Sequence, residues 1–160
     1  MSITLLLDTN VWVDNYCVDH ASNKVVRELL SAAYEKGITL MYPASSIKDV
    51  FYVLGHEFRR IASQGGVLSE SDARAVNEVV WGCVNNMCEI ATAVGVDEGD
   101  MWLARKYKSL TGDLEDNLVL AAAQRAKADY LVTSDRALIQ RATVAALTPA
   151  NMLKTLAALG

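Results

Sequence analysis

The stretch Ile3-Thr4-Leu5-Leu6-Leu7-Asp8-Thr9-Asn10 decides the fold expected for this chain. Its apolar part, residues 3–7, is too short for a helix and predicts a strand that is buried on both faces of a parallel sheet. Asp8 then stands at the carboxyl edge of that sheet, where open α/β folds bind their ligands. Because a carboxylate at such a place is costly unless a cation meets it, Asp8 indicates a cation site.

A second strand near the other end of the chain repeats this arrangement. Residues 130–133 form an apolar run that leads through Ser134 to Asp135. Right-handed crossovers bring the carboxyl ends of parallel strands to one edge of the sheet. We therefore expect Asp8 and Asp135 to share one site.

Apolar runs alternate with helical patterns along the chain, which is typical of βαβ units. Further strands are predicted at residues 39–42, 87–91 and, more weakly, 144–147. Helices are predicted between them, and no repeat or linker interrupts the pattern. The expected structure is one domain over residues 1–160, a three-layer α/β/α sandwich around a central, mostly parallel sheet of four to five strands.

Composition narrows the classes of function. The net charge of −4 disfavours a broad, non-specific nucleic-acid-binding surface, but metal-binding carboxylates add negative charge and so keep a nuclease possible. The three cysteines show no Cys-x-x-Cys spacing and are interpreted as reduced thiols. A secretory signal and an apolar run of about 18 residues are both lacking, so we expect a cytoplasmic protein with no membrane partner.

Further acidic groups stand where the same geometry would deliver them. Asp49 lies near the start of the helix after the second strand, and Asp113 and Asp116 open the helix before the 130–133 strand. Capping of a helix is the better explanation of Asp113 taken alone. Carboxylates packed together repel one another unless a divalent cation neutralises them, and oxygen ligands suit Mg²⁺ or Mn²⁺. Such an ion activates water against a phosphodiester, so the ligands favour phosphodiester hydrolysis.

Four features occur in the order Asp8-Thr9-Asn10-Val11, Asp49, Leu114-Glu115-Asp116 and Thr133-Ser134-Asp135. In these features and their order the chain resembles the PIN-domain family, and especially its VapC-type toxins. The resemblance implies a Mg²⁺- or Mn²⁺-dependent endoribonuclease that acts on RNA. It further implies a homodimer with an antitoxin protein as partner. In that case Asp8, Asp116 and Asp135 bind the metal, and Asp49 completes the catalytic set by positioning the attacking water or a second ion.

The same resemblance implies a set of supporting residues. Thr9, Asn10 and Ser134 match positions that orient the ligands. The family usually has glutamate where this chain has Asp49, whose shorter side chain leaves direct and water-bridged contact with the metal both open. Asp113 remains an alternative third ligand or a supporting group, although the spacing before Asp135 favours Asp116.

The positions of several cationic residues and of the tryptophans also allow predictions. Lys48 and Arg136 adjoin two of the proposed ligands and are predicted to contact RNA phosphate. Arg59-Arg60 is explained at least as well as ordinary solvated surface. Trp12, Trp81 and Trp102 are predicted to lie in the core. For Trp12, an interface with another protein is the alternative.

Two other functions compete with the nuclease. An aspartyl-phosphate phosphatase of the haloacid-dehalogenase kind also begins with a strand-end aspartate, but the position of its general acid holds Asn10 here. A PIN-like fold with a weakened site would instead act as a non-catalytic RNA-binding or protein-interaction module, which the aspartate at position 49 leaves open. The acidic residues at the other positions favour the nuclease.

Overall fold

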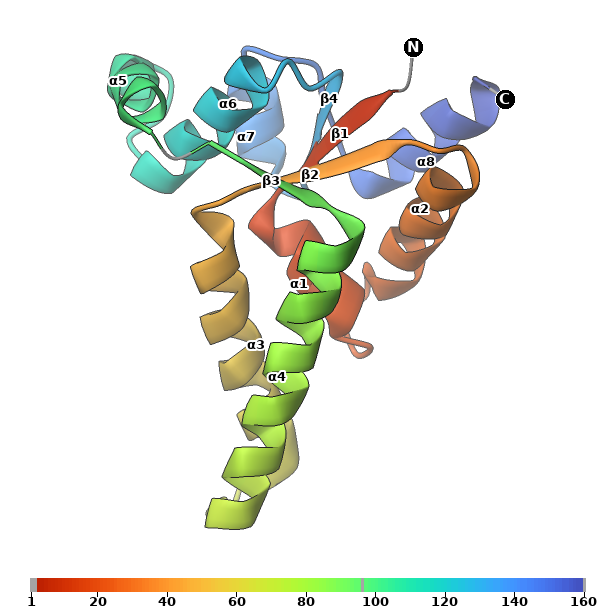
Figure 1. The fold of residues 1–160 in the computed structure, drawn as a ribbon, viewed down its shortest axis with the longest axis vertical. Helices are drawn as coiled ribbons and strands as arrows, with labels where there is room; N and C mark the ends of the chain where they lie inside the picture. The colour runs from red at the N-terminus through yellow and green to blue at the C-terminus, as the bar shows by residue number, and fades with distance from the viewer. Residues whose placement is uncertain (1–2, 96, 160) are drawn as a thin grey trace.

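The computed structural model describes residues 3–95 and 97–159. Within these ranges a five-stranded, fully parallel sheet runs through the molecule in the order β3-β2-β1-β4-β5 (Figure 1). Its strands are β1 (Thr4–Leu7), β2 (Thr39–Pro43), β3 (Thr92–Val94), β4 (Tyr130–Val132) and β5 (Ala146–Leu147). The prediction of a mostly parallel sheet of four to five strands is therefore confirmed.

Each central strand sends alternate side chains to the two faces of the sheet. Leu5 and Leu7 of β1 pack into one core, and Leu6 packs into the other. Strand β4 divides in the same way, with Val132 in the first core and Leu131 in the second. These side chains are fully buried. Because neither face of β1 meets water, its side chains are apolar on both faces, which explains the unbroken apolar run.

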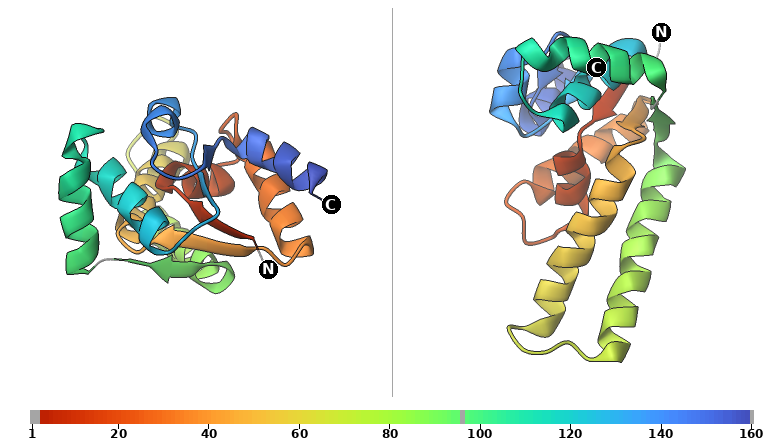
Figure 2. Two further views of the ribbon diagram at one scale, coloured as in Figure 1. Left: turned by 90° about the horizontal axis from the view of Figure 1, so that it is seen from above. Right: turned by 90° about the vertical axis from the view of Figure 1, so that its left-hand side faces the viewer.

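Helices cover both faces of the sheet and complete the predicted three-layer sandwich (Figure 2). The first face carries α1 (Thr9–Tyr16), α2 (Asn23–Glu35), α3 (Ser46–Ser63), α4 (Glu70–Ile90) and α8 (Pro149–Ala158). The second face carries α5 (Glu98–Lys106), the 3-10 helix η1 (Tyr107–Ser109), α6 (Leu114–Arg125) and α7 (Arg136–Arg141). Among the described helices, none combines the length and apolar character that crossing a membrane requires.

Helices α3 and α4 form a pair, here called the arm, that projects from the body of the molecule (Figure 2). The buried side chains of α4 recur at helical spacing and are Val76, Val80, Val84 and Met87. Because this apolar face continues to the end of the helix, α4 takes in residues 87–90, and the strand predicted at 87–91 was wrong. The strand next to β2 begins only at Thr92.

The three tryptophans differ in burial. Trp12 of α1 is fully buried, as predicted. Trp81 of α4 is 49% exposed and Trp102 of α5 is 56% exposed, so the prediction that both lie in the core was wrong. Helical spacing identifies the face on which a side chain lies but not whether another element covers that face. Lys106 partly covers Trp102, with its Nζ 3.6 Å from the ring centroid.

The connections that lead to the two neighbours of β1 run over opposite faces of the sheet. Strand β1 pairs with β2 on one side, after a crossover through α1 and α2, and with β4 on the other side, which is reached through α5 and α6. The carboxyl ends of β1 and β4 thus form a topological switch point, where open α/β sheets bind ligands. Helix α1 begins directly after β1, and α7, which was not predicted, begins at Arg136 shortly after β4.

Candidate functional site

Asp8 lies at the junction of β1 and α1 and is only 7% exposed. Its Oδ1 accepts a hydrogen bond from the backbone N–H of Thr9 at 2.7 Å, so that Asp8 caps α1. Its Oδ2 accepts hydrogen bonds from Thr133 Oγ1 at 2.7 Å and from Asn10 Nδ2 at 2.8 Å. These three bonds fix the orientation of the carboxylate at the strand end.

Thr133 joins the ends of β1 and β4. Its fully buried hydroxyl donates to Asp8 and accepts from Asn10 Nδ2 and from the backbone N–H of Asp135, both at 3.1 Å. Asn10 Oδ1 in turn accepts from the backbone N–H of Ser134 at 3.0 Å. Asn10 therefore touches Asp8 directly, whereas Ser134 takes part through its backbone. Thr133 thus supports Asp8, a role that was not predicted from the sequence although Thr133 stands in the motif before Asp135.

Asp113 and Asp135 each use one carboxylate oxygen to cap a helix. Asp113 Oδ1 accepts from two backbone N–H groups of α6, at 2.8 and 3.2 Å. Asp135 Oδ1 accepts from two backbone N–H groups of α7, at 2.8 and 3.1 Å. Within the described chain, the Oδ2 atom of each aspartate receives no hydrogen bond, so capping accounts for only half of each carboxylate.

The strand ends and these helix starts surround one cleft of about 340 Å³. The acidic side chains that line it are Asp8, Asp14, Asp113, Glu115, Asp116 and Asp135. The remaining lining residues are Thr9, Asn10, Val13, His20 and Val53. The structure thus brings the three predicted metal ligands into one cleft, together with Asp113 and two of the predicted supporting residues.

Two acidic residues of the cleft were missed in the sequence. Glu115 stood inside the Leu114-Glu115-Asp116 motif, but only its neighbours were considered as ligands. Asp14 lies on α1, and its Oδ1 is 2.7 Å from Nδ1 of His20, which follows the helix. Asp14 lies four residues after Asn10, which puts both on one side of α1, and this spacing was the signal that could have identified it.

Asp49, Lys48 and Arg136 lie outside the lining of the cleft. Asp49 is in the first turn of α3, and its charge raises the pKa of Glu115, so its influence reaches the cleft. Lys48 forms an ion pair with Asp49, with 3.8 Å between Nζ and Oδ1. Arg136 is the exposed first residue of α7. These two predicted phosphate contacts therefore border the acidic residues without entering the cleft.

Negative charge is concentrated in the cleft. Burial raises the pKa of the Asp8 carboxyl, and Asp135 raises it further, whereas the three hydrogen bonds to Asp8 oppose the rise. Burial also raises the pKa of Glu115 and of Asp116, and the surrounding carboxylates add to both rises. Arg141 lowers the pKa of Asp116 but does not outweigh them. A cation in the cleft would relieve this repulsion.

The chemistry of these groups fits a hard divalent cation. Carboxylate oxygens are the ligands that Mg²⁺ and Mn²⁺ prefer. Thr9 Oγ1, beside Asp8, is buried and has no hydrogen-bond partner within the described chain, which is typical of a position that a bound group completes. Among residues 3–95 and 97–159, however, no three His, Cys, Asp or Glu side chains lie close enough to share an ion. A metal would therefore have to draw the carboxylates together.

Because burial, with a further contribution from the charge of Asp135, raises the pKa of Asp8, we expect Asp8→Asn to raise the thermal stability of the metal-free protein at neutral pH. An acid whose pKa is raised by folding contributes stability at low pH and loses it as the pH rises through the folded pKa. The gain in Tm over the wild type should be about 2–4 °C for each kcal/mol by which the buried charge destabilises the fold, and it should shrink as the pH falls toward 4. Differential scanning calorimetry in EDTA measures both effects.

Asp129→Asn is the matched control of opposite sign. The pKa of Asp129 is lowered because its Oδ2 accepts from the backbone N–H and the Oγ1 of Thr4, at 2.7 and 2.8 Å. Stability from a lowered pKa is present at neutral pH and is lost as the pH falls through the folded pKa, so this variant should melt below the wild type at pH 7. Equal Tm changes in the two variants would contradict the conclusion that the charge of Asp8 destabilises the metal-free fold.

A family model decides where this chain belongs: the model of the PIN domain matches residues 4–137. The chain belongs to the PIN-domain family. PIN domains are generally nucleases and typically use divalent metals, and the fold is common among toxins of toxin–antitoxin pairs. A comparison with curated protein sequences finds no significant match.

Two solved structures resemble this PIN domain over most of its length. The crystal structure of PAE2754 from Pyrobaculum aerophilum has a TM-score of 0.62 at 16% identity and covers 99% of each chain. The structure of FitAB bound to the IR36 DNA fragment has a TM-score of 0.59 at 16% identity, covering 91% of this chain and 94% of that one. At such identity the two structures support the fold, and the chemistry of the cleft must be derived from this chain's own residues.

Proposed function

We propose that residues 1–160 form a single PIN nuclease domain, a toxin of the VapC type that hydrolyses RNA phosphodiester bonds with Mg²⁺ or Mn²⁺. The observation that carries the proposal is the cleft at the carboxyl ends of β1 and β4, where burial and mutual repulsion raise the pKa of Asp8, Glu115 and Asp116. Membership of a nuclease family supports it.

Asp8, Asp116 and Asp135 are the residues proposed to hold the cation. Asp8 offers a carboxylate of fixed orientation, and Asp135 has one oxygen outside its capping bonds. Between the two candidates on α6 we favour Asp116, because both of its carboxylate oxygens are without hydrogen bonds within the described chain, whereas Asp113 has only Oδ2 outside its capping bonds. When bound, the ion would lower the pKa of a water molecule and stabilise the leaving oxygen.

The remaining residues orient these groups. Thr133 and Asn10 hold the Asp8 carboxylate, and the buried Thr9 hydroxyl faces the same region without a protein partner. Asp49, at the border of the cleft, is proposed to accept a hydrogen bond from the attacking water or to help hold a second ion. Lys48 and Arg136 are proposed to contact substrate phosphate from outside the lining of the cleft.

An antitoxin protein and a second copy of the chain are the proposed protein partners. The exposed apolar side chains of α5 support a protein contact, since Met101 is 42% and Trp102 is 56% exposed. Light scattering on the purified protein measures whether it is a dimer. Cytoplasmic localisation belongs to the same proposal.

A second candidate function has one observation in its favour. Because no three potential ligands of the described chain meet at a common point, the fold would also serve as a non-catalytic RNA-binding or protein-interaction module. The two functions differ in whether a divalent metal converts RNA binding into cleavage.

The deciding experiment incubates the purified protein with a mixed RNA pool in Mg²⁺, in Mn²⁺ and in EDTA. We expect cleavage with either metal and none in EDTA, because in the proposed reaction the water is activated by an ion that the carboxylates hold. Single-stranded DNA of the same sequences tests the substrate class, and is included because FitAB was solved with a DNA fragment. Binding of RNA by the folded protein without cleavage in either metal would favour the non-catalytic module.

A further inference from the structure

One face of α3 carries cationic and aromatic side chains from the cleft toward the tip of the arm. Lys48, Tyr52, His56 and Arg59 follow one another at spacings of four, four and three residues, which places them on one side of the helix. All four are exposed, and Tyr52 is 66% exposed. Together they extend over about 16 Å of helix. We call these four residues the α3 stripe.

Two hollows meet at Tyr52. The first, of about 240 Å³, lies between the helices of the arm, and its wall includes the rings of Phe51, Tyr52 and Trp81. The ring centroids of Phe51 and Trp81 are 5.1 Å apart, and Trp81 keeps half of its surface exposed. The second hollow, of about 340 Å³, contains His56 and Arg59 beside Tyr52. The α3 stripe thus has a cation at each end, Lys48 and Arg59, with aromatic surface at Tyr52 between them.

Arg59 is the cation of the stripe that is most available to a ligand. Arg60 Nη2 lies 2.9 Å from Glu57 Oε2, and Lys48 is paired with Asp49. Within the described chain Arg59 forms no ion pair. An exposed guanidinium without a carboxylate partner is well suited to bind phosphate.

The α3 stripe begins at the acidic cleft. Its first residue, Lys48, pairs with Asp49 in the first turn of α3, with 3.8 Å between Nζ and Oδ1. Val53, the residue after Tyr52, lines the cleft itself. A polymer lying along the stripe would therefore reach the carboxylates at its end nearest the sheet.

We propose that the α3 stripe is a track for single-stranded RNA that leads a phosphodiester into the cleft. The inference rests on the proposed ribonuclease function. Arg59 and Lys48 would contact phosphates, and bases would stack on Tyr52 and on the exposed part of Trp81, which is how proteins bind single strands without reading their sequence. The cations of the stripe stand out in a chain with a net charge of −4, and this charge complementarity selects a nucleic acid over an apolar peptide as the occupant.

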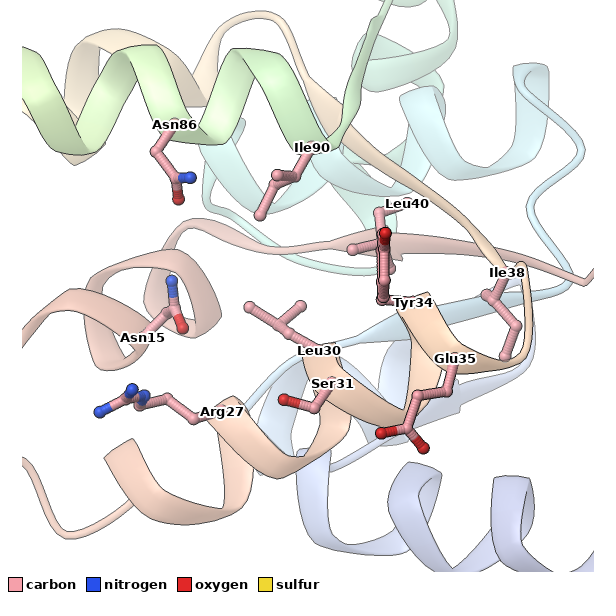
Figure 3. A pocket seen from close by; sticks show the side chains of 10 residues that line it. All are labelled: Asn15, Arg27, Leu30, Ser31, Tyr34, Glu35, Ile38, Leu40, Asn86 and Ile90. Carbon is pink, nitrogen blue, oxygen red and sulfur yellow. The ribbon is translucent and has the colours of Figure 1, made fainter.

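A separate pocket, away from the α3 stripe, also contains an arginine and a tyrosine and provides the matched control. Figure 3 shows a pocket of about 430 Å³ between α2 and the end of α4 that contains Arg27 and Tyr34, the latter 87% exposed. This pocket also contains the carboxylate of Glu35, which disfavours phosphate, and shares no lining residue with the acidic cleft. Replacing its arginine and tyrosine removes the same side chains from a place where we expect no RNA.

The test measures the affinity of a fluorescein-labelled, mixed-sequence 15-nucleotide RNA by fluorescence anisotropy in EDTA, so that cleavage cannot contribute. Tyr52→Ala should weaken binding at least about fivefold, and Tyr52→Phe should restore it, because stacking needs the ring and not the hydroxyl. Arg59→Ala should weaken binding and lower the slope of log Kd against log salt by about 0.7, as expected for one lost phosphate contact. Tyr34→Ala and Arg27→Ala should bind like the wild type.

Equal effects in the Tyr52 and Tyr34 variants, or no metal-free RNA binding by the wild type, would overturn the track. A change of oligomeric state in Tyr52→Ala, seen by light scattering, would also overturn it and assign the surface to a protein contact. The test is independent of the nuclease assignment: a protein that binds RNA through the α3 stripe but fails to cleave it in Mg²⁺ retains the track and loses the proposed ribonuclease activity.

Discussion

Replacing Asp8 with asparagine should reduce metal-dependent RNA cleavage at least about a thousandfold in kcat/KM. A metal ion contributes several kcal/mol to the stabilisation of the transition state, and each 1.4 kcal/mol is a factor of ten in rate. Asp8 is the most buried carboxylate of the cleft, and three hydrogen bonds fix its orientation. Asparagine has nearly the same shape but brings no charge, so the cleft would lose its central anion while the fold remains. Initial rates on a labelled RNA in Mg²⁺ measure the effect.

The control for this prediction is Asp129→Asn, which makes the same chemical change at the opposite edge of the sheet. Asp129 binds Thr4 at the amino ends of β1 and β4 and does not line the cleft. We expect its activity to stay within a few-fold of the wild type, with circular dichroism showing the same fold in both variants. Full metal-dependent activity in Asp8→Asn would refute the proposed role of Asp8.

The fold could be predicted from the sequence because the central strands are continuous apolar runs. The run in residues 3–7 has apolar residues on both sides of the pleat, and the structure places Leu6 in one core and its neighbours Leu5 and Leu7 in the other. Strand β3 gave no such signal, since two of its three residues are exposed, Thr92 and Ala93. Of the apolar residues just before it, Met87 belongs to the buried face of α4 and Ile90 is exposed in the last turn of that helix, which is why the strand was placed too early.

The candidate site could be predicted only in part, for a physical reason. Strand ends and helix starts are positions that a sequence shows directly, and these yielded Asp8, Asp116 and Asp135. The contact between Thr133 and Asp8 spans 125 residues of sequence and depends on the pairing of β1 with β4, which no local pattern contains. The same limit applies to the tryptophans, because the pattern of one helix does not say which neighbour covers it.

Trp12→Ala should lower the free energy of unfolding by about 3–5 kcal/mol, the usual cost of removing a large buried aromatic side chain. Trp12 is fully buried beneath the site, and its ring meets that of Tyr42 edge to face with centroids 6.2 Å apart. Trp12→Phe should cost much less, about 2 kcal/mol or under, because it keeps an aromatic ring and removes an indole N–H that is buried without a partner within the described chain. Urea unfolding followed by circular dichroism measures both values.

The same substitution at an exposed tryptophan separates burial from the mere loss of a ring. Trp102 is 56% exposed and contacts the Lys106 ammonium group, a cation–π interaction that is worth about 0.5–1 kcal/mol at such sites. Trp102→Ala should therefore cost no more than about 1 kcal/mol. If Trp12→Ala proved equally mild, Trp12 would not be an important part of the core. Other contacts would then have to hold α1 in place, and with it Thr9 and Asn10, which donate hydrogen bonds to Asp8.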